Sequence, residues 1–95
     1  MADETDLPPI LIKLEEVLTL QQAAHRANKS VDTVKRLCRK HHIARQAGPH
    51  GRMEISAVAL EMVIHGDLKA LAQLRSGNRD DQMVRRYFDH LGLPI

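Results

Sequence analysis

The residues of this chain that are best suited to chemistry are the basic side chains between Thr19 and Arg52. This segment holds eight lysines and arginines against one aspartate, a net charge of +7, whereas the residues before it carry −4 and those after it −1. Guanidinium and ammonium groups neutralise phosphates, and arginine can also pair bidentately with guanine in the major groove of DNA. A basic block of this density, in a chain with a total charge of only +2, is typical of a surface that binds duplex nucleic acid.

Two short helices are predicted to position these side chains. The first begins after Thr19, a good N-cap, and runs to about Ala27 because small and apolar residues recur at helical spacing. A turn follows at Asn28, since asparagine tolerates the left-handed conformation that such a turn needs. Ser30 then caps a second helix over about residues 31–40.

The second helix divides into an apolar and a polar face. The apolar residues are Val31, Val34, Leu37 and Cys38. Near its N-terminus, where a recognition helix reaches base edges, we expect base contacts from Asp32, Thr33 and Arg36. For contacts with the DNA backbone we expect Lys29, Ser30, Lys35, Arg39, Lys40 and Arg45. The alternative is a solvated basic face on an ordinary pair of helices.

A hairpin with a charged tip is predicted to follow. Residues 43–46 and 52–55 have the composition of short strands, and the glycine- and proline-containing residues 47–51 form a loop of hairpin length. As a wing, this hairpin would place His50 and Arg52 against phosphates or in a minor groove. The alternative is a plain connecting turn.

The rest of the chain is predicted to be helical, except for residues 10–18, which fit either a short strand or a helical turn. Ser56, Asp67 and the pair Asp80 and Asp81 introduce helices over about residues 57–65, 68–75 and 80–90. An apolar stripe on the last one leaves two interpretations open, packing on the protein's own core or contact with a neighbouring copy or an integrase. The stripe residues assigned to such a contact are Tyr87, Phe88 and Leu91.

Three stretches together resemble the MerR-like winged-helix domains of phage and integrative-element excisionases. The stretches are Leu18-Thr19-Leu20-Gln21-Gln22-Ala23-Ala24, Asn28-Lys29-Ser30-Val31-Asp32-Thr33-Val34-Lys35-Arg36 and Gly48-Pro49-His50-Gly51-Arg52-Met53-Glu54-Ile55. They match the family's capped helix, its turn with recognition helix, and its glycine–arginine wing with a strand, over about residues 17–64. Asn28 stands where the family usually has glycine, and Asp32 where a basic residue is common, so the family's base preference is not carried over.

The resemblance implies a mainly α, winged helix-turn-helix fold with a small two-stranded wing and C-terminal helices. It implies an accessory factor for recombination, which binds repeats in double-stranded DNA cooperatively, bends them and promotes excision by a tyrosine or serine integrase. The alternatives are a small MerR-like transcription regulator, a phage small terminase subunit, or a module that binds an acidic protein and not DNA. The predicted organisation is an acidic arm over residues 1–16, a DNA-binding domain over 17–76 and a helical extension over 77–95.

Other functions find little support in the sequence. Cys38 lies close to His41 and His42, but zinc sites commonly need a second pair of ligands, so we expect a small buried thiol and no metal site. No third group orients such a pair for catalysis, and we expect neither enzyme activity nor a cofactor or small-molecule substrate. The single cysteine, the acidic N-terminus and the lack of a long apolar run favour a cytoplasmic protein without a membrane partner.

Overall fold

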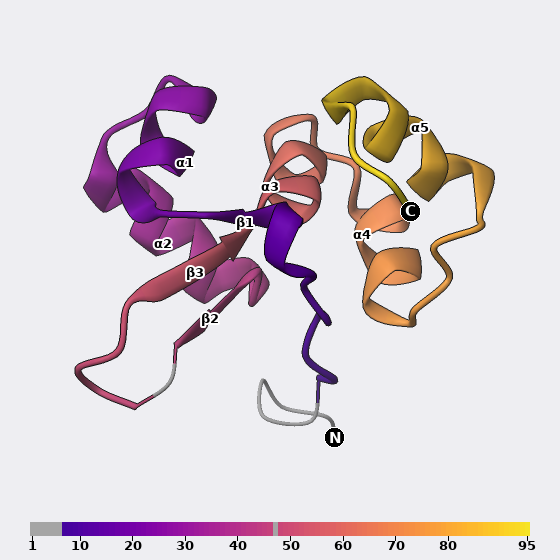
Figure 1. The fold of residues 1–95 in the computed structure, drawn as a ribbon. Coiled ribbons are helices and arrows are strands. Elements are labelled where there is room, and N and C mark those ends of the chain that lie inside the picture. Colours follow the sequence, from indigo (N-terminus) through magenta and orange to yellow (C-terminus); the bar gives the residue numbers. More distant parts are fainter. Residues whose placement is uncertain (1–6, 47) are drawn as a thin grey trace.

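The computed structural model describes residues 7–46 and 48–95, and over them the protein is mainly helical with one small antiparallel sheet. The helices are α1 (Leu20–Ala27), α2 (Val31–His41), α3 (Ala57–Ile64), α4 (Leu68–Arg75) and α5 (Gln82–Leu91), preceded by a short 3₁₀ turn, η2 (Leu14–Glu16). The strands are β1 (Val17–Leu18), β2 (Ala44–Gln46) and β3 (Met53–Ser56). Figure 1 shows α3 at the centre, with α1, α2 and the hairpin of β2 and β3 on one side and α4 and α5 on the other.

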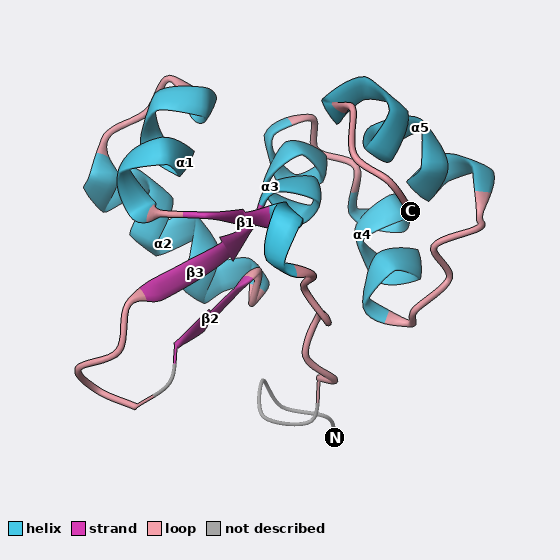
Figure 2. Ribbon diagram, in the orientation of Figure 1, coloured by secondary structure: helices cyan, strands magenta, loops and turns pink. Residues whose placement is uncertain are grey.

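The sheet has the strand order β1, β3, β2, and both neighbouring pairs are antiparallel (Figure 2). The predicted hairpin is confirmed, with Arg45 opposite Glu54 in the register. β2 and β3 form the predicted two-stranded hairpin, and Val17 and Leu18 add a third strand by pairing with the other edge of β3. The two interpretations of residues 10–18 are therefore both partly right, since η2 leads directly into a strand.

Capping groups begin and end α1 where the sequence predicts. Thr19 Oγ1 accepts from the Gln22 N–H at 3.1 Å, and Gln22 Oε1 accepts from the Thr19 N–H at 2.9 Å, which together form a capping box. Asn28 ends the helix in the left-handed region with φ of 55°. Ser30 then starts α2, since its hydroxyl accepts from the Thr33 N–H at 3.1 Å.

The later helices also begin at their predicted caps. Asp67 accepts from the first turn of α4, and Asp81 from the first turn of α5. Gly66 has the predicted left-handed conformation, with φ of 68°. α2 ends at His41 and α5 at Leu91, each one residue beyond the predicted end, and α3 ends at Ile64, one residue before it.

A single apolar core joins both sides of the molecule. Its fully buried members include Ala23, Val34, Ile43, Ile55, Val58, Leu60, Met62, Ala70, Val84 and Phe88. Ile10 and Ile12 belong to the same cluster, so this part of the predicted acidic arm packs on the folded body. Residues 1–6 of that arm, and Ala47 of the predicted hairpin loop, lie outside the described residues. No described helix is long and apolar enough to cross a membrane.

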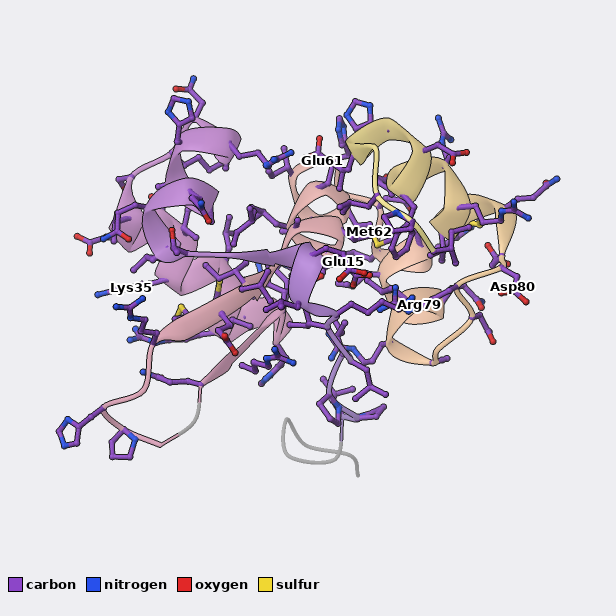
Figure 3. The ribbon with its side chains drawn as sticks, viewed as in Figure 1. Glu15, Lys35, Glu61, Met62, Arg79 and Asp80 are labelled. Carbon is purple, nitrogen blue, oxygen red and sulfur yellow. The ribbon has the colours of Figure 1, made fainter. Side chains whose placement is uncertain are left out.

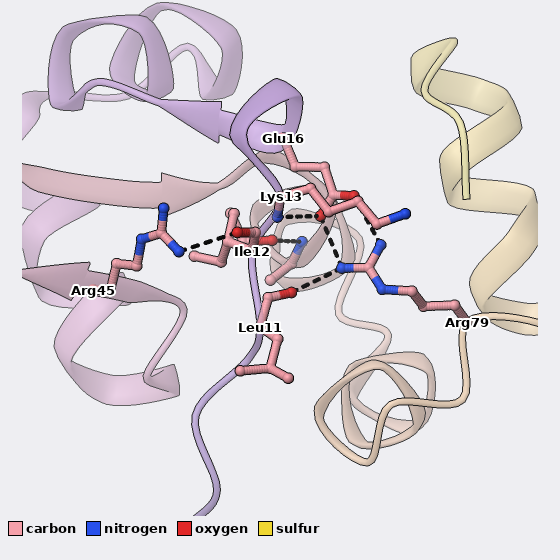
Figure 4. Close-up of polar contacts among 8 residues, drawn as sticks. Leu11, Ile12, Lys13, Glu16, Arg45 and Arg79 are labelled. Carbon is pink, nitrogen blue, oxygen red and sulfur yellow. Dashed lines mark hydrogen bonds and ion pairs between the residues drawn. The ribbon is translucent and has the colours of Figure 1, made fainter.

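A buried ion pair fastens the N-terminal segment to the loop before α5 (Figure 4). Glu16 is only 1% exposed. The Arg79 guanidinium donates to both of its carboxylate oxygens, at 2.8 and 3.0 Å, and to the Leu11 carbonyl oxygen at 2.8 Å. The same guanidinium lies 5.1 Å from the centroid of the Phe88 ring. Two parallel charge-assisted bonds of this kind fix both position and orientation.

Candidate nucleic-acid interface

The outer face of α2 is basic and open to solvent. Val34 and Cys38 are buried beneath it, which confirms the predicted apolar face, whereas Asp32, Arg36 and Arg39 are exposed. The exposed basic residues of the turn and helix are Lys29, Arg36, Arg39 and Lys40, and Lys35 is half-buried. Figure 3 labels Lys35 beside α2 at the edge of the molecule. Within residues 7–46 and 48–95, no ion pair engages any of these cations.

Hydrogen bonds at the start of α2 distinguish among the predicted contacts there. The Ser30 hydroxyl caps the helix and also donates to Thr33 Oγ1 at 2.9 Å. Thr33 Oγ1 in turn accepts from Arg36 Nη2 at 3.4 Å. Ser30 and Thr33 therefore organise the helix end and orient the guanidinium, while Asp32 and Arg36 remain exposed on the surface.

The hairpin carries one engaged and one unengaged arginine. Arg45 Nε donates to Glu54 Oε1 at 2.8 Å across the strands. Its Nη1 donates to the Ile12 carbonyl oxygen at 3.0 Å, as Figure 4 shows. To contact the DNA backbone as predicted, the Arg45 guanidinium would have to leave these two partners. His50 and Arg52 are exposed at the tip, and no ion pair of the described chain involves Arg52.

A shallow hollow of about 430 Å³ lies between the C-terminal half of α2 and the hairpin. Its lining consists of Cys38, Arg39, His42, Ala44, Arg45, Gln46 and Met53. Arg39 of the helix and Arg45 of the strand therefore border the same concave surface. The basic helix face and the hairpin are adjacent parts of one side of the protein.

Arg75 fixes the end of α2 from the other half of the chain. Its guanidinium donates to the carbonyl oxygens of His41 at 2.6 Å, His42 at 3.4 Å and Pro8 at 3.1 Å. A cation at this position also suits the negative end of the helix dipole. Partial burial, together with the nearby charges of Lys40 and Arg75, lowers the pKa of His41. His41 is therefore protonated less readily than an imidazole in water.

Cys38 is a core residue. It is 4% exposed, as predicted for a small buried thiol, and burial raises its pKa to about 11. The thiol is therefore protonated at neutral pH and packs as an apolar group beneath the basic face.

The predicted contact surface on the last helix is wrong for two of its three residues. Phe88 is fully buried and Tyr87 is 8% exposed, and both belong to the core together with Val84. Leu91 is half-buried and packs against the same cluster. The apolar stripe follows helical spacing because it fills the protein's own core. The most exposed large apolar side chains of the described residues are instead Leu11 and Leu14.

A scan against protein-family models, a search of curated proteins and a search of solved structures found no match to this chain. The resemblance to excisionases therefore stays a prediction that rests on the residues quoted for it.

Two arginines with fixed contacts were not singled out from the sequence. Arg75 and Arg79 lie near the end of α4 and just after it, and both reach carbonyl oxygens more than thirty residues away in the chain. Nothing in the sequence marks them, because an arginine that binds a distant carbonyl has the same local pattern as an exposed one. Likewise His65 and His90 are far apart in the sequence, but both lie against Glu61.

Proposed function

We propose that this chain is a winged helix-turn-helix protein that binds double-stranded DNA, with α2 as the recognition helix and the hairpin of β2 and β3 as the wing. The observation that carries the proposal is the exposed surface of α2 and the turn before it, where Lys29, Arg36, Arg39 and Lys40 are in no ion pair within the described chain. An α-helix fits the major groove of B-DNA, and unpaired cations beside it would neutralise phosphates.

In the proposed docking mode the cations have different tasks. Arg36 lies near the start of α2, where side chains reach base edges, and its hydrogen bond to Thr33 limits the directions its guanidinium takes. Arg39 and Lys40, further along the helix, suit phosphates on the groove wall. Arg52 on the hairpin tip suits the neighbouring phosphates or minor groove. Asp32 is the exception, because its carboxylate repels phosphates and is useful only next to a donor such as the cytosine amino group.

Within this class we propose an excisionase, a factor that directs recombination towards excision. The support is the combined pattern of the capped first helix, the turn with Ser30, and the glycine- and arginine-containing hairpin. Such a protein would bend its site, which costs about 1–6 kcal/mol for a smooth bend of 20–30 base pairs. Copies bound side by side would offset this cost. Tyr87 and Phe88 are excluded from such contacts by their burial.

A salt titration tests DNA binding. If about five to seven phosphates are neutralised, the plot of log affinity against log salt concentration has a slope of about −4.5 to −6. The variant Arg39→Gln should weaken binding and flatten the slope, whereas Arg85→Gln, an exposed arginine on α5, should change neither. No affinity for duplex DNA, or a slope near zero, would favour a module that binds an acidic protein.

Footprinting separates the excisionase from a small transcription regulator or a terminase subunit. An excisionase should protect several repeats beside an attachment site, with occupancy that rises cooperatively, and it should change the direction in which an integrase works. Protection of a single promoter site without any effect on recombination would identify a regulator. Binding confined to a packaging site would identify a terminase subunit.

A further inference from the structure

Two histidines from different helices contact the same carboxylate on the side of the molecule formed by α3 and α5. His65 Nε2 lies 3.2 Å from Glu61 Oε1, and His90 Nε2 lies 3.4 Å from the same oxygen. The donor atoms of all three residues lie within 4.8 Å of one another. Figure 3 shows Glu61 at the end of α3 that lies beside α5.

The packing of α3 against α5 holds these ligands in place. Glu61 is largely buried, with its side chain 13% exposed, and His65 follows it by one helical turn. Tyr87, one turn before His90, is buried, and its hydroxyl donates to the Asp67 carboxylate at 2.8 Å. The position of His90 opposite Glu61 is therefore fixed by the core and by a hydrogen bond one turn away.

The distances suit a tetrahedral metal ion. Ligand atoms about 2.0–2.1 Å from a zinc ion, at tetrahedral angles, lie about 3.3–3.4 Å apart. The two distances to the Glu61 oxygen, 3.2 and 3.4 Å, are close to this value. Two imidazole nitrogens and a carboxylate oxygen form a common ligand set of first-row transition metals.

The surroundings also favour a cation with an open coordination position. His65 is the C-cap of α3, and His90 lies in the last turn of α5, so the negative ends of two helix dipoles meet at the cluster. The two imidazoles are 56% and 63% exposed, and His65 and His90 line an open hollow together with Arg86, Tyr87 and Asp89. A bound ion would be reached from solvent through this hollow and would keep one position for water or an anionic ligand.

We propose that Glu61, His65 and His90 form a binding site for one divalent transition-metal ion, with Zn²⁺ as the expected ion. The ion would replace the hydrogen bond between His65 and Glu61 and the contact of His90 with the same oxygen, and it would join α5 to the end of α3. This site lies on the other side of the molecule from α2 (Figure 1), and the proposal does not depend on DNA binding.

The test is metal binding by the full, untagged chain after removal of metal with a chelator. Titration with Zn²⁺ should give one ion per chain in calorimetry and should raise the temperature of unfolding. Co²⁺ in place of Zn²⁺ should give the visible absorption of a four- or five-coordinate site. Replacement of either ligand, in His65→Gln or His90→Gln, should weaken binding by at least about 100-fold, the upper end of what loss of an outer-shell partner costs.

His25→Gln and His50→Gln are matched controls, because both histidines are exposed and lie on other elements. Their affinity, stoichiometry and thermal shift should equal those of the unchanged chain. The circular dichroism of each variant without metal verifies that it is folded. Weak binding without a 1:1 end point would overturn the proposal, and so would unchanged binding by the His65 and His90 variants, which would place the ion elsewhere.

Discussion

The arginines of α2 and those around α4 have the same side chain and opposite surroundings. Arg36 and Arg39 point into solvent over a buried apolar face, and no carboxylate of the described chain pairs with them. Arg75 and Arg79 are half-buried, and both donate to backbone carbonyl oxygens of distant segments. Arg75 and Arg79 are therefore structural cations, whereas Arg36 and Arg39 are free to meet an external anion, as the proposed DNA binding requires.

Among the arginines compared, substitution of Arg79 should have the largest effect, and it should act on the free energy of unfolding. Arg79→Met should lower the free energy of unfolding by about 3–5 kcal/mol, because it leaves the Glu16 carboxylate buried without its partner. Urea denaturation at neutral pH measures this loss. The double variant Glu16→Leu with Arg79→Met should regain most of it, since an apolar pair needs no charge compensation. A loss below about 1 kcal/mol in the single variant, the range of exposed ion pairs, would mean that Arg79 is no more than a surface cation.

The sequence predicts those features of the structure that depend on residues close together in the chain. The helix boundaries were predictable within about two residues, because the caps at Thr19, Ser30 and Asp67 act over three or four positions. The basic face of α2 was predictable for the same reason, since helical spacing alone separates Val34 from Arg36. For residues 10–18 the sequence left a strand and a helical turn open, because Val17 and Leu18 form a strand only by pairing with residues nearly forty positions later.

The candidate sites show the same limit. The cations of α2 follow from composition and periodicity, but the engagement of Arg45 by Glu54 and Ile12 needs the register of the sheet and the path of the N-terminal segment. The metal-binding cluster needs α5 to pack on α3, and only the spacing of Glu61 and His65 is local. The apolar stripe with Phe88 was recognised, but periodicity does not reveal whether such a stripe faces its own core or a partner.

The next largest effect is predicted at Arg36, on the unpaired side. Arg36→Ala should weaken binding to the preferred DNA site by about 1–3 kcal/mol and blur the preference at one base pair. The free energy of unfolding should stay within about 0.5 kcal/mol of the unchanged chain, as for a surface substitution. Competition binding against single-base-pair variants of the site measures both affinity and specificity. Arg85→Ala is the control, and equal effects from both variants would contradict the docking mode.

A smaller effect is predicted for the hydrogen bond between Tyr87 and Asp67. Tyr87→Phe should lower the free energy of unfolding by about 0.5–1.5 kcal/mol, because it removes one partly buried hydrogen bond but keeps the ring. DNA affinity should not change, since both residues lie on the side formed by α4 and α5. Thermal or urea unfolding at several pH values measures the difference.

The pH dependence of that difference has a defined sign. The hydrogen bonds from Tyr87 and from the Ala70 N–H lower the pKa of Asp67 below its ordinary value of 3.8. Its contribution is therefore present above pH 3.8 and is lost as the pH falls through the lower, folded-state value. Burial, followed by the bond to Asp67, raises the pKa of Tyr87 from 10.0 to about 12. The tyrosine's contribution is present below pH 10 and is lost as the pH rises towards 12. The stability difference between Tyr87→Phe and the unchanged chain should therefore be largest between pH 3.8 and pH 10.

The smallest effect is predicted within the hairpin. There Arg45 is bound to other groups of the protein, whereas Arg52 is exposed and in no ion pair of the described chain. Arg52→Gln should reduce the salt slope of DNA binding by about one and weaken binding equally for different sequences. Arg45→Gln should leave the slope nearly unchanged, because its guanidinium is already bound to Glu54 and the Ile12 carbonyl oxygen. Its cost should appear in stability instead, within about 1 kcal/mol, since the ion pair is exposed. If Arg45→Gln alters the slope as much as Arg52→Gln does, Arg45 leaves Glu54 and the Ile12 carbonyl oxygen when DNA binds. The contacts of an arginine in the free protein would then not show whether it binds DNA.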